Sequence, residues 1–411
     1  MKKKVLAMAL ATTMVATSFA GCGASSSNSG SNGDSKDITL TVWSPAEDQS
    51  KKEGNWLKKE CEAFNKEHSE WNIKFKYGVC PEGEAKDKVT TDVDAAADVY
   101  MFANDNLSAL VKANAIAKLG GKTLEQVKNQ NDDLMLNTVT YKDSVYGVPF
   151  TANTWFMYYD KSVFSEDEAK SLDAMLAKDK VSFPLSNSWY IASAYVANGG
   201  TLFGDDQTDE KAGINFGGDN GTAVTNYLID LSKNPNFQDD KDNSGQSAFC
   251  DGSVKAFFSG TWAYSDAKKA LGDNLGITTP PTIKINGEDK QLKSFAGSKA
   301  IGVNPNSKHQ EVAVALAAYL GSEKAQKDHF ELRNIVPSDK NIDVSSDILS
   351  KAQAETIEKA SIMQPMVDKM GNYWGPAQSM GEEILAGTVT KDNAADKTAK
   401  MNDAMNTDAV K

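Results

Sequence analysis

Apolar and polar residues follow two kinds of spacing along this chain. Ile38–Trp43, Asn72–Val79 and Val99–Phe102 carry apolar residues in short runs or at every second position, which predicts β-strands. The apolar residues of Trp56–His68 and Leu107–Ala115 recur at helical spacing, which predicts helices between those strands. Alternating strands and helices are typical of an α/β fold in which helices cover a mostly parallel sheet.

The order of these elements indicates where a ligand would bind. Ligands of open α/β sheets bind beyond the carboxyl ends of the strands, so the loops after Trp43 and Phe102 are candidates. The residue pattern from about 343 to 404 predicts helices throughout, and we expect this segment to pack on the outside of the fold. With 411 residues the chain exceeds the size that one hydrophobic core usually reaches, so we expect two lobes.

The first residues have the layout of a secretory signal. Lys2–Lys4 are followed by Val5–Phe19, which are small or apolar and carry no charge. This run is too short to span a bilayer. Ser18–Cys22 resemble the lipobox of bacterial lipoproteins, in which the cysteine thiol receives a diacylglyceryl group. We therefore expect a signal peptide over 1–21 and a lipid on Cys22; ordinary signal cleavage that leaves Cys22 as a free thiol is the alternative.

The segment after this cysteine predicts a tether. Residues 22–36 are mostly Gly, Ser, Asn and Asp, and such a composition buries too little apolar surface to offset the entropy of ordering. Two acyl chains hold a protein on a bilayer where one chain would let it leave. We therefore expect a flexible, lipidated tether over 22–36, and contact with the membrane through the lipid on Cys22 only.

Charge narrows the class of partner. The chain has 44 Lys and Arg against 56 Asp and Glu, a net charge of −12, and loss of Lys2–Lys4 with the signal makes it more negative. This sign argues against nucleic acid and anionic lipid surfaces as partners. The only arginine is Arg333, whereas sites for carboxylates or phosphate usually use a guanidinium group. Neutral ligands are therefore favoured.

Cysteine and acidic spacing give little support to metal chemistry. Cys61, Cys80 and Cys250 show no zinc-type spacing with one another or with histidine, and a Cys61–Cys80 disulfide and buried free thiols both remain open. Asp240–Asp251 matches the spacing of a calcium loop, but a position that such loops keep aliphatic is polar here. We expect a helix capped by Ser244 instead, and neither a metal nor a cofactor.

Several segments together resemble one known family. The chain looks like the maltose and maltodextrin-binding family of extracellular solute-binding proteins of ABC importers. The segments that carry the resemblance occur in the family's order over most of the chain, namely Thr39–Trp43, Ala97–Asp105, Tyr146–Lys161, Ala197–Gly200, Phe257–Tyr264 and Gly297–Asn304.

The resemblance implies two α/β lobes hinged around a central cleft, the type II periplasmic-binding-protein fold. Applied to this chain, it implies a first lobe of 37–150 and 281–334, and a second lobe of 151–280 and 335–411. The chain would cross between them near Pro149–Asn153, Thr279–Thr282 and Ile335–Ser338. Closure of the cleft over a ligand would be a hinge motion.

The family's aromatic positions are filled in this sequence. Pyranose rings have an apolar face of C–H groups, which stacks on flat aromatic side chains, and a rim of hydroxyl groups. The positions that the resemblance marks as platforms or their neighbours are Phe102, Trp189, Trp262, Tyr373 and Trp374. Several platforms imply an oligosaccharide rather than a single sugar.

Polar positions of the family are filled as well. Asp105 matches a carboxylate that the family directs at sugar hydroxyls, and Glu47 and Asp48 follow the first strand where the family has a charged pair. A carboxylate accepts from two hydroxyls and makes stronger hydrogen bonds than a neutral group. Asn153 and Asn187 stand where the family has carboxylates.

The resemblance thus implies a monomeric lipoprotein on the outer face of a bacterial cytoplasmic membrane, with no catalytic residue. Its partners would be a neutral oligosaccharide, foremost a maltodextrin-like α-glucan, and the transmembrane subunits of an ABC importer. A binding protein for a different oligosaccharide is one alternative. A secreted glycoside hydrolase is the other, because an acidic chain always contains carboxylate pairs that could face each other across a cleft.

Overall fold

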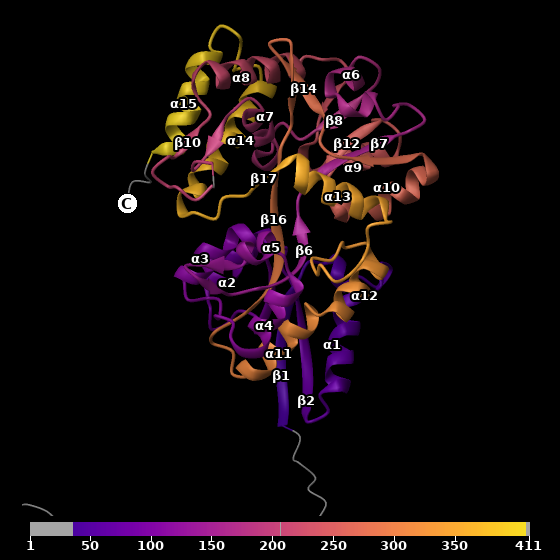
Figure 1. Ribbon diagram of the computed structural model, residues 1–411, viewed down its shortest axis with the longest axis vertical. Helices are drawn as coiled ribbons and strands as arrows, with labels where there is room; N and C mark the ends of the chain where they lie inside the picture. The colour runs from indigo at the N-terminus through magenta and orange to yellow at the C-terminus, as the bar shows by residue number, and fades with distance from the viewer. Residues whose placement is uncertain (1–35, 206, 408–411) are drawn as a thin grey trace, which may run out of the picture.

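The structure, a computed structural model, describes residues 36–205 and 207–407. It consists of two α/β lobes stacked along the long axis of the molecule (Figure 1). The expected signal peptide, Cys22 and the tether lie outside the described residues, except for Lys36, which begins the first strand. Among the described helices, none combines the length and the apolar character that crossing a membrane requires.

The first lobe is organised by a sheet whose central strands are buried. Its strands, in spatial order, are β2 (Trp71–Val79), β1 (Lys36–Ser44), β3 (Val99–Ala103), β16 (Ser294–Val303) and β6 (Val148–Asn153). β1 is parallel to β2 and β3, whereas β16 is antiparallel to β3 and β6. In β1, Ile38, Leu40 and Val42 are buried, because successive side chains point to opposite faces of a strand.

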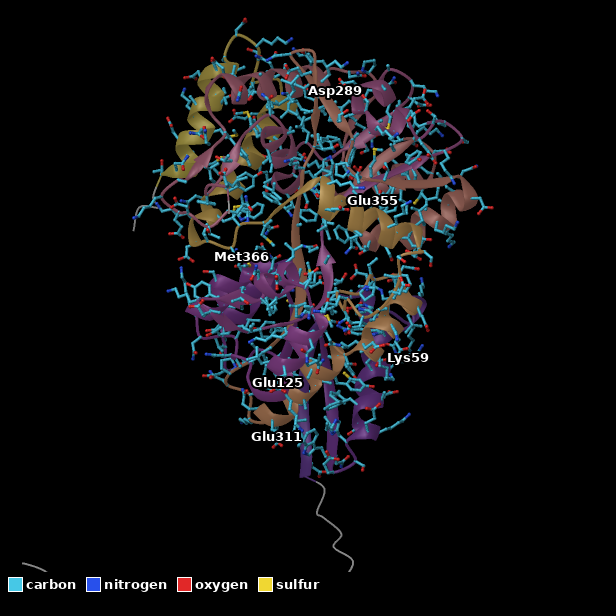
Figure 2. The ribbon with its side chains drawn as sticks, in the orientation of Figure 1. Lys59, Glu125, Asp289, Glu311, Glu355 and Met366 are labelled. Atoms are coloured by element: carbon cyan, nitrogen blue, oxygen red, sulfur yellow. The ribbon has the colours of Figure 1, made fainter. Side chains whose placement is uncertain are left out.

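The second lobe has a sheet of mixed direction. Its strands, in spatial order, are β11 (Phe237–Asp239), β8 (Val181–Phe183), β12 (Ala256–Ser259), β7 (Phe156–Asp160) and β13 (Leu275–Thr278). The two buried faces of this sheet belong to two clusters. Met157 and Phe258 pack with the terminal helices, while Phe156 and Phe257 pack with the helix over 348–359. Side chains therefore fill both faces of the sheet. Figure 2 shows the side chains of both lobes around their ribbons.

Helices cover both sheets. The first lobe has α1 (Trp56–Glu67), α2 (Ala85–Thr91), α3 (Leu107–Lys112), α4 (Gly121–Gln130), α5 (Asp133–Thr138), α11 (Gln310–Leu320) and α12 (Glu323–Arg333). The second lobe has α6 (Leu172–Leu176), α7 (Ser188–Ala197), α8 (Gly218–Ser232), α9 (Ser244–Cys250), α10 (Tyr264–Leu271), α13 (Ile348–Lys359), α14 (Gly371–Leu385) and α15 (Ala394–Asn406).

Short elements complete the chain. The 3-10 helices are η1 (Glu47–Gln49), η2 (Lys51–Glu53), η3 (Glu82–Glu84), η4 (Asn104–Asn106), η5 (Glu168–Lys170), η6 (Lys241–Asn243), η7 (Thr261–Ala263), η8 (Gly272–Asn274) and η9 (Asp368–Met370). The small strands are β4 (Thr140–Tyr141), β5 (Ser144–Val145), β9 (Thr201–Leu202), β10 (Ile214–Asn215), β14 (Thr282–Ile285), β15 (Glu288–Gln291) and β17 (Ser361–Met363).

Three segments connect the lobes. β6 leads directly into β7, and β16 runs from a pairing with β17 at Ser294–Ala296 into the first-lobe sheet. The third segment follows α12, where Pro337 forms a bridge with Thr151 and the Thr151 hydroxyl donates to the carbonyl of Val336 at 2.6 Å.

Two sequence expectations need correction here. The chain does not cross at Thr279–Thr282: β14 and β15 form a hairpin whose Ile283 and Ile285 are buried in the second-lobe core, and the crossing follows at β16. Residues 281–293 therefore pack with the second lobe, not the first. The stretch expected to be helical throughout also contains a strand, because β17 pairs with Ser294–Ala296 at the start of β16.

Candidate functional site

A cavity of about 550 Å³ lies between the lobes and is lined by both. The first lobe and the connecting strands contribute Pro81, Glu82, Gly83, Lys86, Asp87, Ala103, Asp105, Asn153 and Lys299. The second lobe contributes Ser188, Trp189, Trp262, Gln364 and Trp374. We call this cavity the cleft.

The second-lobe wall of the cleft is aromatic. Trp189 begins the first turn of α7, Trp262 lies on η7 after β12, and Trp374 lies in the first turn of α14. All three are half-buried, and the ring centroids of Trp189 and Trp262 are 6.1 Å apart. A Cβ on Gly260 would lie 2.1 Å from the ring of Trp262, so only glycine lets the backbone pack against that ring.

Polar contacts hold these rings in place. The indole N–H of Trp189 donates to Oε1 of Gln364 at 3.0 Å, and Gln364 itself is 3% exposed. The hydroxyl of Tyr373 donates to the carbonyl of Ser188 at 2.6 Å, which fixes the start of α7. Tyr373 is fully buried, so the expectation that it contacts ligand needs correction: it supports the wall and presents no face to the cleft.

Asn187 lies beside the cleft rather than in it. Its side chain caps α7 by accepting from the backbone N–H of Trp189 at 2.9 Å. The exposed remainder lines a neighbouring polar cavity of about 300 Å³, together with Asp240, Gln378 and Glu382. This neighbouring cavity and the cleft both border the first turn of α7.

The first-lobe wall is polar. Asp105, on η4 after β3, accepts from the side-chain amide of Asn106 at 3.0 Å. Burial raises the pKa of Asp105, while Asn106 and the more distant Lys86 lower it by a smaller amount. Asn153 ends β6 and lines the same cleft. Hydrogen bonds from the Asn106 side chain and from backbone N–H groups thus offset only part of the effect of burial, in a cleft that a ligand can reach.

Phe102 is not part of this wall. All five residues of β3 are buried, because the strand lies between β1 and β16 and has side chains packed on both faces. Phe102 is fully buried in the first-lobe core, and a Cβ on Gly147 would come within 2.8 Å of its ring. The expectation of a Phe102 platform is corrected by this position: no ring face is left for a ligand.

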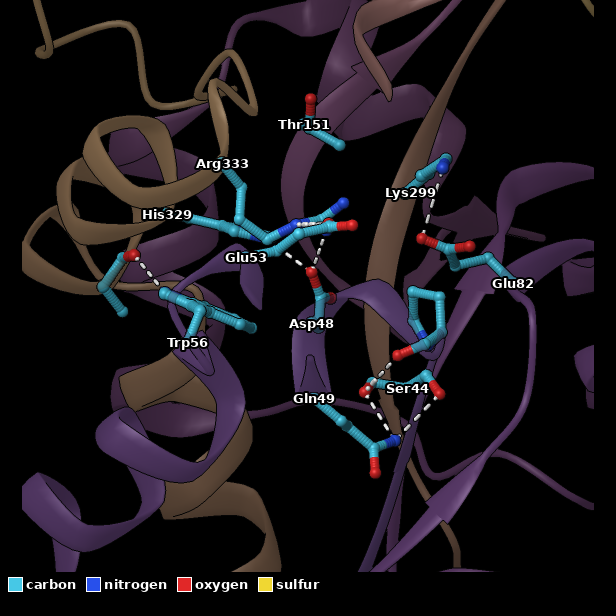
Figure 3. A network of polar contacts seen from close by, with 12 residues as sticks. Ser44, Asp48, Gln49, Glu53, Trp56, Glu82, Thr151, Lys299, His329 and Arg333 are labelled. Atoms are coloured by element: carbon cyan, nitrogen blue, oxygen red, sulfur yellow. Dashed lines mark hydrogen bonds and ion pairs between the residues drawn. The ribbon is translucent and has the colours of Figure 1, made fainter. Parts of the chain in front are cut away.

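The charged pair expected after the first strand is divided in the structure. Glu47 is exposed on η1 and does not line the cleft. Asp48 is 1% exposed and accepts from Nε2 of His329 at 2.8 Å and from Nη1 of Arg333, as Figure 3 shows. Asp48 is therefore corrected from a ligand-binding residue to the centre of a buried ion cluster.

The surroundings of Asp48 set its ionisation. Burial alone would raise the pKa of this carboxyl, but His329 and Arg333 together outweigh burial and hold the pKa below its ordinary value. The cluster is closed on its other sides. The His329 ring stacks on Trp56 at 3.9 Å between centroids, and Nε of Arg333 donates to Glu53 at 3.1 Å.

A second charged pair, which the sequence did not suggest, lies in the cleft itself. Nζ of Lys299, on β16, is 3.2 Å from Oε1 of Glu82, on η3 (Figure 3). The same Nζ lies 5.0 Å from the ring centroid of Trp262. The side chains of Lys299 and Glu82 are only 20% and 10% exposed. The two residues are 217 positions apart in the sequence, so no local motif links them.

The lobes also touch at the rim of the cleft. Asp368, on η9 of the second lobe, accepts from the Ser108 hydroxyl and pairs with Lys112, both on α3 of the first lobe. Met366, labelled in Figure 2, marks the level of this segment between the two lobes. These rim contacts join the lobes without lining the cleft.

A larger cavity, about 670 Å³, lies between α5, the segment 336–345 and α13. Its lining contains no aromatic residue. The cleft therefore remains the better candidate for a ligand that stacks.

The structure describes the surroundings of three cysteines and of the segment Asp240–Asp251. Cys61, Cys80 and Cys250 are free, and Cys61 and Cys80 are buried. Within 36–205 and 207–407, no three His, Cys, Asp or Glu side chains are grouped so as to hold a metal ion. Asp240 instead accepts from the backbone N–H of Gly245 at 2.7 Å, at the start of α9.

Comparison with known proteins places the chain in a family. The family model for bacterial extracellular solute-binding proteins matches residues 59–356. The chain belongs to this family. The solute-binding protein is 27% identical to the galactooligosaccharide-binding protein of Bacillus subtilis (strain 168), over 94% of this chain and 93% of the relative. It is 22% identical to the maltotriose-binding protein of Pyrococcus abyssi (strain GE5 / Orsay), over 74% and 69%.

Solved structures have the same fold as this solute-binding protein. One, solved with acarbose, is 53% identical, with a TM-score of 0.86 over 90% of this chain and 98% of that chain. The maltodextrin-binding protein MalE1 from L. casei BL23, without ligand, is 23% identical, with a TM-score of 0.79 over 90% and 99%. The two-lobed type II fold expected from the sequence is thereby confirmed. The family and the relatives named here are binding proteins, not enzymes.

Proposed function

We propose that this solute-binding protein binds a neutral oligosaccharide, foremost an α-1,4-linked glucan of the maltodextrin type, in the cleft and delivers it to an ABC importer. The observation that carries the proposal is the composition of the cleft. Trp189, Trp262 and Trp374 lie on the wall opposite Asp105, a carboxylate that lines the same cleft. Stacking surfaces and hydroxyl acceptors are the two requirements of a sugar site.

Two further observations support an oligosaccharide over a single sugar. Three tryptophans at separate places on one wall provide more stacking surface than one pyranose ring can cover. The relatives are named for galactooligosaccharides and maltotriose, and a structure 53% identical to this chain was solved with acarbose.

The direct test is calorimetry on the purified protein with maltotriose, maltotetraose and a galactotriose, alongside glucose as a small control. We expect saturable binding of the maltodextrins, with a rise in melting temperature because ligand stabilises only the folded state. Preference for galactotriose would replace the glucan with the ligand class of the Bacillus subtilis relative. Chromatography after incubation separates the remaining class: shortened sugars would show a glycoside hydrolase, and unchanged sugars a binding protein.

Closure provides an independent test of the site. A ligand that touches both walls favours the closed state by the free energy of contacts made only there. In small-angle scattering, a saturating oligosaccharide should not increase the radius of gyration of the protein. Molecules that are open without ligand should close, so their radius of gyration should become smaller. Binding that leaves an open population unchanged would locate the site within one lobe.

We also propose that the protein is held on the outer face of the cytoplasmic membrane by a lipid on Cys22. The support is the sequence around Cys22, since the acceptor thiol follows the apolar signal directly. Cys22→Ala should release the protein from membranes into the medium, with Cys250→Ala as the matched control. Membrane retention of Cys22→Ala would remove the lipoprotein proposal and leave sugar binding untouched.

A further inference from the structure

The pairing of β6 with β16 shifts its register next to Lys299, a residue of the cleft. β16 pairs with β6 through Gly297, Ser298 and Lys299, and the register then shifts between Lys299 and Ala300. The extra residue is Phe150, on β6, because Lys299 pairs with Thr151 and Ala300 with Pro149. β16 itself keeps a continuous register with β3 from Lys299 to Val303, and the Lys299 side chain lines the cleft.

Two contacts from different lobes hold the Lys299 ammonium. Oε1 of Glu82 lies 3.2 Å from Nζ on the first-lobe side, and the Trp262 ring lies 5.0 Å from it on the second-lobe side. A cation over an aromatic face is attracted by the ring's electrons. Lys299 is thus fixed beside a ring that can stack a sugar.

Hydrogen-bonding capacity remains unused on both members of the pair. An ammonium has three N–H donors, and the structure gives Lys299 one carboxylate acceptor and one ring. A carboxylate accepts at both oxygens, and only Oε1 of Glu82 contacts Lys299. Since both side chains line the cleft, one donor and one acceptor are presented side by side to a ligand.

We propose that Lys299 and Glu82 are specificity-determining residues that recognise two adjacent hydroxyls of the sugar unit stacked on Trp262. Lys299 donates to one hydroxyl oxygen, and the neighbouring hydroxyl donates to Glu82. In a 1,4-linked glucan every internal unit keeps its 2- and 3-hydroxyls free, so the pair selects linkages that leave this diol intact. This inference rests on the proposed binding of an oligosaccharide in the cleft.

Selectivity follows from the burial of the pair. Because Glu82 and Lys299 are mostly shielded from water, a ligand that closes the cleft without the diol leaves the remaining donors of Lys299 and the second oxygen of Glu82 desolvated and without a partner. A site built to hydrogen-bond a hydroxyl discriminates strongly against an analogue that lacks it.

The experiment compares two ligands on four proteins. The ligands are maltotriose and a maltotriose analogue that lacks the 3-hydroxyl on every unit. The proteins are the wild type, Lys299→Met, which keeps the length of the stem but removes the donors, Glu82→Ala, and Lys293→Met as control. Lys293 precedes β16, does not line the cleft and has the same change of charge.

For maltotriose, Lys299→Met and Glu82→Ala should each bind about 10- to 100-fold more weakly than the wild type, and Lys293→Met should bind equally well. The deoxy analogue should bind the wild type about as weakly as maltotriose binds the variants. The variants should hardly distinguish the two sugars. Melting temperatures of the free proteins identify any variant that fails to fold, and Glu82→Gln, which keeps an acceptor, should recover part of the affinity.

Variants that lose affinity equally for both sugars, or not at all, would overturn the diol assignment. Such variants would show that the pair only positions Trp262 or plays no part. Failure of the wild type to bind any oligosaccharide would instead overturn the proposed function, so the two failures are distinct.

Discussion

Asp48 and Asp105 are two carboxylates of the first lobe with the same predicted role and opposite surroundings. Asp48 accepts from His329 and Arg333 inside the lobe, and its pKa is lowered. Asp105 faces the cleft, and burial raises its pKa more than the hydrogen bonds from Asn106 and from nearby backbone N–H groups lower it.

The difference teaches that the supply of donors, not the residue type, separates a structural carboxylate from a binding one. A buried charge is tolerated in a fold when donors of the protein satisfy it. A carboxylate left short of donors in an accessible cleft has acceptor capacity for a ligand. Glu82 and Lys299 meet the same criterion, because both line the cleft and both have hydrogen-bonding groups that their ion pair does not use.

The strongest test of this contrast is Asp48→Ala. The change leaves the Arg333 guanidinium, 7% exposed, with only Glu53 as partner, and should lower the free energy of unfolding by about 3–5 kcal/mol. Urea denaturation measures this loss, and Glu47→Ala, at the exposed neighbouring position, is the control. Affinity of the folded Asp48→Ala protein should stay unchanged; a large loss of affinity with intact stability would return Asp48 to the site.

Asp105→Ala should have the opposite profile. Loss of a charged acceptor should weaken binding of maltotriose by about 10- to 100-fold, because a hydrogen bond to a charged group contributes about 1.5–3 kcal/mol. Stability of the free protein should hold, since burial of this carboxylate is costly rather than favourable. Calorimetry and urea denaturation on one preparation give both values, and unchanged affinity would remove Asp105 from the site.

The aromatic wall should respond less per residue than the charged groups. Trp262→Ala and Trp374→Ala should each weaken binding about tenfold, from lost stacking and apolar contact, with little change in the melting temperature of the free protein. Trp155→Ala is the contrasting variant, since Trp155 is fully buried and should lose stability instead. A large stability loss in Trp262→Ala with affinity intact would assign that ring to the core.

Acidification should lower ligand affinity before it lowers stability, and the effect should be smaller than the effects of the substitutions above. Asp105 has a raised pKa, so it takes up a proton at a higher pH than an ordinary aspartate, whose pKa is about 3.9. Affinity should therefore fall about three- to tenfold as the pH is lowered towards that ordinary value. Asp48 has a lowered pKa in the folded protein. Its contribution to stability is therefore complete above the pKa that it has in the unfolded chain, and it is lost as the pH falls through the lower pKa of the folded state. Calorimetry and urea denaturation across pH should therefore show affinity declining first; simultaneous loss would contradict the contrast.

The rim contact should give the smallest effect. Asp368→Asn weakens the contacts with Lys112 and Ser108. The side chains of Lys112 and Asp368 are half-exposed, so water and salt screen this ion pair. We expect affinity to fall about two- to threefold at low ionic strength and the difference to shrink at high salt. Asp403→Asn, on α15 away from the cleft, should match the wild type at every salt concentration.

The sequence predicted some parts of this site better than others. The family resemblance marked Trp189, Trp262 and Trp374, and all three line the cleft. Their contact with a ligand stays a prediction. Phe102 was misplaced although its continuous apolar run is itself typical of a strand buried on both faces.

Contacts between distant segments were beyond sequence reasoning. The Asp48 cluster depends on α12 packing beside η1, and Lys299 meets Glu82 only after the sheet has formed. Gln364 follows a strand that no local pattern indicated, since β17 exists by pairing with β16. The signal and Cys22 lie outside the described residues and stay predictions.

The path of β16 constrains the order in which a newly made chain can fold. The first-lobe sheet needs Lys299–Val303, which are synthesised after every strand of the second-lobe sheet. The second-lobe core in turn includes Met401 and Met405 near the end of the described chain. Neither lobe can complete its core until most of the polypeptide has been made, because the first-lobe core also includes Ile335. Each lobe therefore reaches its full stability only late in synthesis.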